Sequence, residues 1–290
     1  MEDKKDYKLV FDNIVEDLRQ YVINNKLKSM VLGISGGIDS TVCAAICHEV
    51  SKKTGVPLIG RSLTIKNKKD EIDTSILVGK AFCNDFKERY INGMFVDVES
   101  DLRCFESKYY KDKWTNPIAD GNIQARLRMI YLYHLAGITN GFVIDSDNKT
   151  ENLLGFWTIC GDVGDYKPIG NLWKTEVYEL AKYLEEKYKY NSDMKVVAVN
   201  QSIGLTPTDG LGISSSDLEQ IGANSYEEVD EILKGLLASF EEQHSNIDSV
   251  IKSFKEGYNG NIDKDVVDKV CDRYRKSNFK RLPKPIAKIN

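Results

Sequence analysis

The sequence predicts an α/β protein in which helices cover both faces of a parallel sheet, a doubly wound arrangement. In roughly the first 190 residues, short apolar runs alternate with longer segments whose apolar residues recur at helical spacing. This alternation is typical of βαβ units, whose crossover helices bury parallel strands on both faces. From about residue 200 the helical pattern continues without apolar runs, so a helical C-terminal part is expected.

The first elements follow from apolar spacing. Residues 7–25 predict a helix, because Val10, Ile14 and Leu18 recur at helical spacing. The apolar run at 31–34 predicts a strand, and a helix-forming run follows it after two adjacent glycines. The next elements expected are strands over residues 56–61 and 94–98, separated by a helix over residues 70–82.

A long helix is expected over residues 122–135, with an apolar stripe that includes Leu127 and Ile130. Arg126 lies near its first turns, where the helix dipole disfavours a cation, so either an anionic partner or a solvent-exposed position is expected. The remaining elements expected are a strand over 141–144, a polar turn over 145–151, a helix over 174–188, a mobile loop over 204–212 and helices over 226–240 and 266–277.

Residues 33–40, which we call the phosphate loop, join the first strand to its helix. Unpaired N–H groups and the helix dipole favour an anion at such a helix start. Glycines let phosphate oxygens approach the main chain, and hydroxyl groups add donors. The carboxylate of Asp39 would repel a bare phosphate, so its presence indicates a bridging Mg²⁺. The candidate phosphate-binding residues are Gly33, Ser35, Gly36, Gly37 and Ser40.

The pattern of this loop, Ser-Gly-Gly-Ile-Asp-Ser, resembles the SGGxDS loop of the ATP pyrophosphatases, which cleave ATP between its α and β phosphates. The ordinary P-loop pattern, GxxxxGK[ST], is absent because no lysine precedes Ser40. An ordinary glycine-rich turn between a strand and a helix is the alternative interpretation.

Composition and charge narrow the class of protein. The chain has 290 residues and a formal net charge of −4, without a basic block that would favour nucleic acid. No apolar run is long enough to span a bilayer, and residues 1–8 are not an apolar leader, so a cytoplasmic location is expected. The six cysteines form no CxxC pair, and we expect them to be reduced packing residues.

Four blocks in order carry a wider resemblance. They are the phosphate loop, residues 122–129 (Asn-Ile-Gln-Ala-Arg-Leu-Arg-Met), residues 147–151 (Asp-Asn-Lys-Thr-Glu) with Gly161-Asp162, and residues 172–175 (Leu-Trp-Lys-Thr). With these blocks the chain resembles the ammonia-dependent NAD synthetases. The resemblance implies an adenine nucleotide alpha hydrolase-like fold and one domain over residues 1–290, with a core over about 25–190 and a helical C-terminal part over about 200–290.

The resemblance also implies the reaction and its participants. The nicotinate carboxylate of deamido-NAD attacks the α-phosphate of ATP, and ammonia then displaces AMP from the acyl-adenylate to give NAD. Positioning two anions against each other is the main task, so Mg²⁺ and cationic side chains are expected to dominate the site. Family members that use glutamine carry an added amidase domain, for which no room is expected here.

Site residues carry over from the family position by position. Asp39 and Glu151 would hold Mg²⁺, and Asp39 and Lys174 would serve catalysis. ATP would contact the candidate phosphate-binding residues together with Arg61, Ser146, Lys174 and Thr208. The dinucleotide would contact Arg126, Asp165 and Lys280, although the loop before Pro168 is one residue shorter than usual.

The chain departs from the family pattern at two places. Ile159 stands where many members have a lysine that contacts the pyridine nucleotide, and Phe279 stands where a histidine is usual. We expect a nearby cation such as Lys167 or Lys149 to replace the lysine, so that deamido-NAD is still the substrate. Preference for nicotinate mononucleotide is the other outcome.

Other functions remain open on the sequence alone. A sulfur transferase or tRNA-modifying ligase could use the same loop, but it would need a reactive cysteine or an RNA-binding surface. An adenine-nucleotide sensor would not need the Mg²⁺ pair or Lys174. The family resemblance, together with amphipathic helices over 7–25 and 122–135, predicts a homodimer whose site includes both subunits.

Overall fold

A computed structural model describes residues 5–109, 116–190, 192–208, 216–243 and 246–282. Within these residues the sheet has four parallel strands in the order β3-β2-β1-β4. The strands are β1 (Met30–Gly33), β2 (Leu58–Thr64), β3 (Asp85–Tyr90) and β4 (Phe142–Val143). Residues 209–212 of the loop expected over 204–212 lie outside the described residues.

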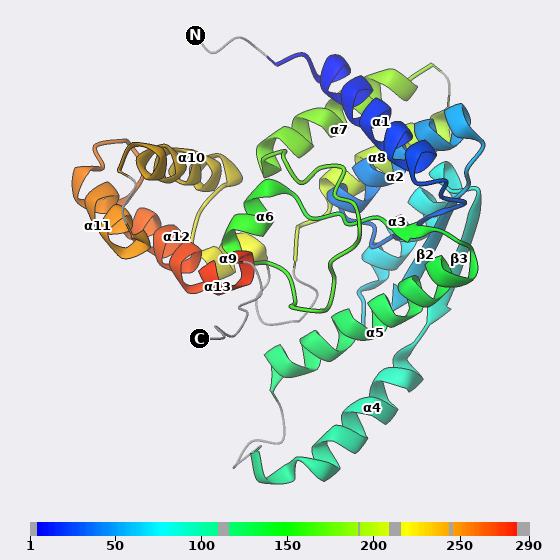
Figure 1. Ribbon diagram of the computed structural model, residues 1–290, viewed down its shortest axis with the longest axis horizontal. Coiled ribbons are helices and arrows are strands. Elements are labelled where there is room, and N and C mark those ends of the chain that lie inside the picture. The colour runs from blue at the N-terminus through cyan, green and yellow to red at the C-terminus, as the bar shows by residue number, and fades with distance from the viewer. Residues whose placement is uncertain (1–4, 110–115, 191, 209–215, 244–245, 283–290) are drawn as a thin grey trace, which may run out of the picture.

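Helices cover both faces of the sheet, which confirms the predicted doubly wound α/β class (Figure 1). Met30 and Leu32 of β1 pack into the core of one face, and Val31 between them packs into the core of the other. The first face carries α1 (Tyr7–Asn24), α2 (Ile38–Thr54), α3 (Lys69–Phe82), α7 (Lys174–Tyr188) and α8 (Asp193–Gly204). The second carries α4 (Asn92–Phe105), which a short 3-10 turn (Ser107–Tyr109) follows, and α5 (Pro117–Ile138).

The C-terminal helices form a third core beside the sheet (Figure 1). Leu154 and Trp173 extend into this core from the sheet-forming part of the chain. Its elements are α6 (Lys149–Leu154), α9 (Asp217–Ile221), α10 (Tyr226–Gln243), α11 (Ile247–Gly257) and α12 (Lys264–Lys276). The short helix α13 (Asn278–Arg281) follows α12. None of the helices described is both long and apolar enough to cross a membrane.

The predicted third strand is wrong. Residues 94–98 lie in α4, where Phe95 is buried and Val98, one helical turn later, packs against the same core. The strand that pairs with β2 is instead β3, an edge strand whose sequence is Asp-Phe-Lys-Glu-Arg-Tyr. An edge strand has one covered side, so its charged residues give no apolar run.

The apolar stripe predicted for residues 122–135 needs one correction. Ile130 is 60% exposed, whereas Gln124 on the same helix is 5% exposed. The helix also begins earlier, at Pro117, with Asn116 as its N-cap. The polar turn expected over 145–151 contains the start of a further short helix, α6.

Candidate active site

The phosphate loop is shaped by its own hydroxyl groups. Gly37 is the N-cap of α2, and its N–H donates to Oγ of Ser35 at 3.2 Å. Oγ of Ser40 donates to the carbonyl oxygen of Gly37 and lies 3.0 Å from Oγ of Ser35. The loop therefore places two hydroxyl groups and the start of a helix at the carboxyl end of β1, where parallel sheets bind ligands.

Gly36 packs closely against a neighbouring helix, and its expected contact with phosphate stays a prediction. Its φ is +90°, and a Cβ atom there would lie 2.6 Å from the carbonyl oxygen of Glu71. The glycine therefore allows close packing of the loop against α3, and Gly36 is not among the pocket-lining residues.

One pocket of about 630 Å³ opens beside the phosphate loop. It brings together most of the predicted site residues from six separate parts of the chain. Its lining includes Gly33, Ser35, Gly37, Asp39, Ser40, Arg61, Ser146, Glu151, Lys174, Thr208 and Lys280.

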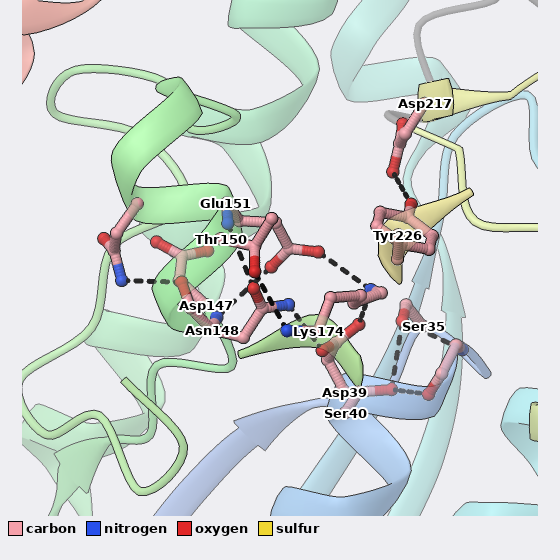
Figure 2. Close-up of polar contacts among 12 residues, drawn as sticks. Ser35, Asp39, Ser40, Asp147, Asn148, Thr150, Glu151, Lys174, Asp217 and Tyr226 are labelled. Carbon is pink, nitrogen blue, oxygen red and sulfur yellow. Dashed lines mark hydrogen bonds and ion pairs between the residues drawn. The ribbon is translucent and has the colours of Figure 1, made fainter. Parts of the chain in front are cut away.

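Lys174 joins the two carboxylates that were predicted to hold a metal. Its Nζ atom lies 2.5 Å from Oδ2 of Asp39 and 2.9 Å from Oε1 of Glu151 (Figure 2). The lysine side chain is 1% exposed, and the two carboxylate side chains are 16% and 18% exposed. The ammonium group therefore compensates two carboxylates at the wall of the pocket.

Asn148, which the sequence analysis did not single out, connects these carboxylates. Its Nδ2 donates to Oδ1 of Asp39 at 2.8 Å, and its Oδ1 accepts a hydrogen bond from the backbone N–H of Glu151. Oε2 of Glu151 in turn accepts from the backbone N–H of Asn148, which completes a capping box at the start of α6. The Asn-x-x-Glu spacing is the sequence signal that could have identified it.

Burial and charge shift the protonation of this group. Burial and the charge of Asp39 raise the pKa of Glu151 to about 7. Burial alone would lower the pKa of Lys174, but Asp39 and Glu151 outweigh it and hold that pKa well above its usual value. The negative charges of Asp39 and Glu151 are thus stabilised by the neighbouring charge of Lys174.

The donor set fits Mg²⁺, since this ion commonly takes one or two carboxylates and completes its shell with phosphate oxygens and water. Asp39 and Glu151 already converge on one cationic atom, the Nζ of Lys174. Within the described part of the chain no group of three or more His, Cys, Asp or Glu side chains is arranged to hold a metal alone. A bound phosphate would therefore have to supply ligands.

Two of the three residues expected to contact the dinucleotide lie outside this pocket. Arg126 is exposed, and its NH2 atom donates to the carbonyl oxygen of Ile159 at 3.0 Å. Asp165 accepts hydrogen bonds from the backbone N–H of Val143 and from the hydroxyl of Tyr133. In the single chain, neither residue is among those that line the pocket.

Lys167 and Lys149, the two lysines expected to replace the family lysine at the Ile159 position, both make other contacts. Lys167 lies 3.1 Å from Oδ2 of Asp145 and 2.9 Å from Oδ2 of Asp147, and Lys149 lies over the ring of Trp173. Neither lysine is among the pocket-lining residues, and replacement of the family lysine by one of them stays a prediction.

Lys280 lines the pocket instead, and its Nζ donates to the carbonyl oxygens of Gly155 and Trp157. Burial lowers the pKa of this lysine. Arg61 also faces the pocket, but its guanidinium is paired with Asp85, 2.9 Å from Oδ2.

Comparison with known proteins agrees with this arrangement. The chain is 32% identical over 232 residues to an NH(3)-dependent NAD(+) synthetase from Campylobacter jejuni, covering 80% of this chain and 84% of the relative. It is 30% identical over 282 residues to the enzyme of the same name from Methanocaldococcus jannaschii, covering 97% and 96%.

Solved structures show the same fold. The structure of an NMN synthetase from Francisella tularensis matches with a TM-score of 0.76 at 24% identity, covering 99% of this chain and 100% of that one. An NH3-dependent NAD synthetase from Campylobacter jejuni matches with a TM-score of 0.68 at 23% identity, covering 98% and 100%. The model of the family described as NAD synthase matches residues 10–284, and the chain therefore belongs to the NAD synthase family.

Proposed function

We propose that the chain amidates deamido-NAD to NAD with ATP and ammonia, through an acyl-adenylate. The observation that carries the proposal is the convergence of Asp39, Glu151 and Lys174 beside the phosphate loop in one pocket of a chain of this family. A sensor that only bound ATP would have no use for two carboxylates held against a buried lysine. The ligase interpretation of the sequence is supported by the relatives named above.

The reaction has two steps. A carboxylate oxygen of the substrate forms a bond to the α-phosphorus of ATP, and the bond from this phosphorus to the bridging oxygen breaks, releasing pyrophosphate. The nitrogen of ammonia then bonds to the acyl carbon, the bond from this carbon to the AMP oxygen breaks, and nitrogen loses a proton. Each step brings anions together, so cations and fixed N–H donors lower its barrier.

The residues of this pocket suit these tasks. The hydroxyl groups of Ser35 and Ser40 and the start of α2 would hold the departing pyrophosphate. Lys174 is charged and fixed by its two carboxylates, so it would offset negative charge that develops on the phosphates. Mg²⁺ held by Asp39 and Glu151 would add a further neutralising charge when bound.

We further propose that the protein is a homodimer and that its partner completes the dinucleotide site. Large apolar residues of α5 are exposed, with Ile118 at 61%, Ile130 at 60% and Ile138 at 65%. Arg126 is exposed on the same helix, which suits a residue that meets substrate held by the other subunit. Light scattering should give twice the mass of the chain, and an active monomer at assay concentration would contradict the dimer.

We also propose that residues 1–290 form one functional domain and that the protein is located in the cytoplasm.

The direct test of function is an assay of purified protein with ATP, Mg²⁺, deamido-NAD and ammonium. Pyrophosphate, AMP and NAD should form in equal amounts, and their formation should require both the pyridine substrate and ammonium. Pyrophosphate release that depended on tRNA instead would overturn the proposal.

A further inference from the structure

Asp230 lies in the C-terminal helical part, yet its hydrogen bonds reach the active-site helices. It is 1% exposed on α10. Its Oδ1 accepts from the hydroxyl of Thr150 at 2.5 Å, and its Oδ2 accepts from the hydroxyl and the backbone N–H of Thr175 at 2.8 and 3.0 Å. Thr150 directly precedes Glu151, and Thr175 directly follows Lys174.

These contacts complete the start of α7. The N-cap of this helix is Trp173, which offers no side-chain acceptor to the first N–H groups. The backbone N–H of Lys174 donates to Oγ1 of Thr150 at 2.9 Å, and the next N–H, that of Thr175, donates to Asp230. Buried N–H groups without acceptors are costly, and the helix dipole favours a carboxylate here. Asp230 thus supplies from another helix the cap that Trp173 lacks.

The same carboxylate ties α6 to α7. Oγ1 of Thr150 accepts from Lys174 and donates to Asp230, so the two helices meet at one hydroxyl group. Thr150 is fully buried, which excludes water as a substitute partner. The position of Lys174 relative to Glu151, whose charged atoms are 2.9 Å apart, therefore depends on Asp230.

We propose that Asp230 is a positioning residue that holds Lys174 and Glu151 in their working geometry. The inference rests on the proposed ligase function for its kinetic consequence, but not for its geometric one. It assigns the C-terminal helical part a defined role in the reaction, since α10 supplies the carboxylate that sets the α6–α7 junction.

The test compares Asp230→Asn and Thr150→Val with Leu233→Ala. Leu233 is fully buried on the same helix but belongs to the apolar core of the C-terminal helices, so its truncation lowers stability without touching the junction. For each variant, kcat, KM for ATP and the free energy of unfolding are measured. Labelling of Lys174 by an amine-reactive reagent is followed by peptide mass mapping.

We expect Asp230→Asn to lower kcat by at least about tenfold with KM for ATP within about twofold, because a misplaced group loses transition-state stabilisation. Lys174, 1% exposed in the native protein, should become labelled in this variant and stay protected in Leu233→Ala. Thr150→Val should give the same pattern, and the double variant should be no worse than the more impaired single one, because both act through one junction.

Three results would overturn the proposal: an unchanged kcat in a folded Asp230→Asn protein, an equal loss of kcat in Leu233→Ala, or additive losses in the double variant. If Asp230→Asn does not fold, Thr150→Val decides by the same criteria. If the native protein shows no ligase turnover, the proposed function fails, whereas the labelling of Lys174 still supports or refutes the positioning role.

Discussion

The Nζ atom of Lys174 lies 2.5 Å from Oδ2 of Asp39, although the two residues are separated by 135 positions in the chain. One begins the helix after the phosphate loop and the other begins α7, so two helix starts meet at the carboxyl edge of the sheet. Glu151, at the start of α6, completes the group. The site is therefore built where three helix starts converge, a place that favours anionic ligands.

The first prediction concerns the two carboxylates. Asp39→Ala and Glu151→Ala should each lower kcat/KM by about 10²-fold or more, because each removes part of the charge arrangement around the phosphates. Lys174 keeps one carboxylate in either variant, so both should remain folded by circular dichroism. Glu179→Gln, at an exposed carboxylate on α7, is the matched control. Near-normal pyrophosphate release in either alanine variant would refute the assignment.

Gly36 supplies a prediction about the loop itself. Gly36→Ala should destabilise the protein by about 1–3 kcal/mol, because φ is +90° and the new Cβ atom would meet the backbone of α3. Gly55→Ala is the control, since Gly55 also has positive φ but open space around it, and it should cost only about 1 kcal/mol. Urea unfolding measures both. Equal losses would show that close packing of Gly36 contributes nothing.

Apolar spacing and turn residues in the sequence predicted most of the helices and strands of the sheet-forming part. The helix over 174–188 and the phosphate loop have clear apolar spacing and turn residues, and the structure has both at those positions. β3 could not be predicted, because an edge strand with charged residues lacks an apolar run. The side of α5 on which Arg126 lies depends on how this helix is rotated against the sheet. The expected apolar stripe gave the wrong rotation, because it included Ile130, which is exposed.

Long-range polar contacts were the other part that the sequence did not reveal. Asp230 carries no local signal, because its partners, Thr150 and Thr175, are on other helices. Asn148 had a capping signal, but its contact with Asp39 depends on the fold. Asp39, Glu151 and Lys174 were expected at one site only through the family resemblance.

A further prediction concerns acid stability. Burial lowers the pKa of His48 from its usual 6.5 and outweighs the hydrogen bond to the Phe82 carbonyl, which raises it. The charge of Lys195 lowers the pKa further, and that of Glu49 opposes it. Lys195 lies 2.6 Å from Nε2, so the neutral ring accepts from the lysine while Nδ1 donates to the Phe82 carbonyl oxygen. The stabilising contribution is thus present above pH 6.5 and is lost as the pH falls through the lowered pKa.

His48→Gln should therefore reduce the loss of unfolding free energy between about pH 6.5 and pH 5. His134→Gln, at an exposed histidine on α5, should leave that loss unchanged. Denaturant unfolding at several pH values gives the comparison. An identical pH dependence in the native protein and in His48→Gln would show that this histidine does not contribute.

The most direct test of the account compares two pyridine substrates in the same assay. With ATP, Mg²⁺ and ammonium, kcat/KM for deamido-NAD should exceed that for nicotinate mononucleotide, with one AMP and one pyrophosphate released per NAD formed. Replacing ammonium with glutamine should abolish turnover. A clear preference for nicotinate mononucleotide would contradict the proposed substrate, and the absence of pyrophosphate with either compound would contradict the proposed reaction.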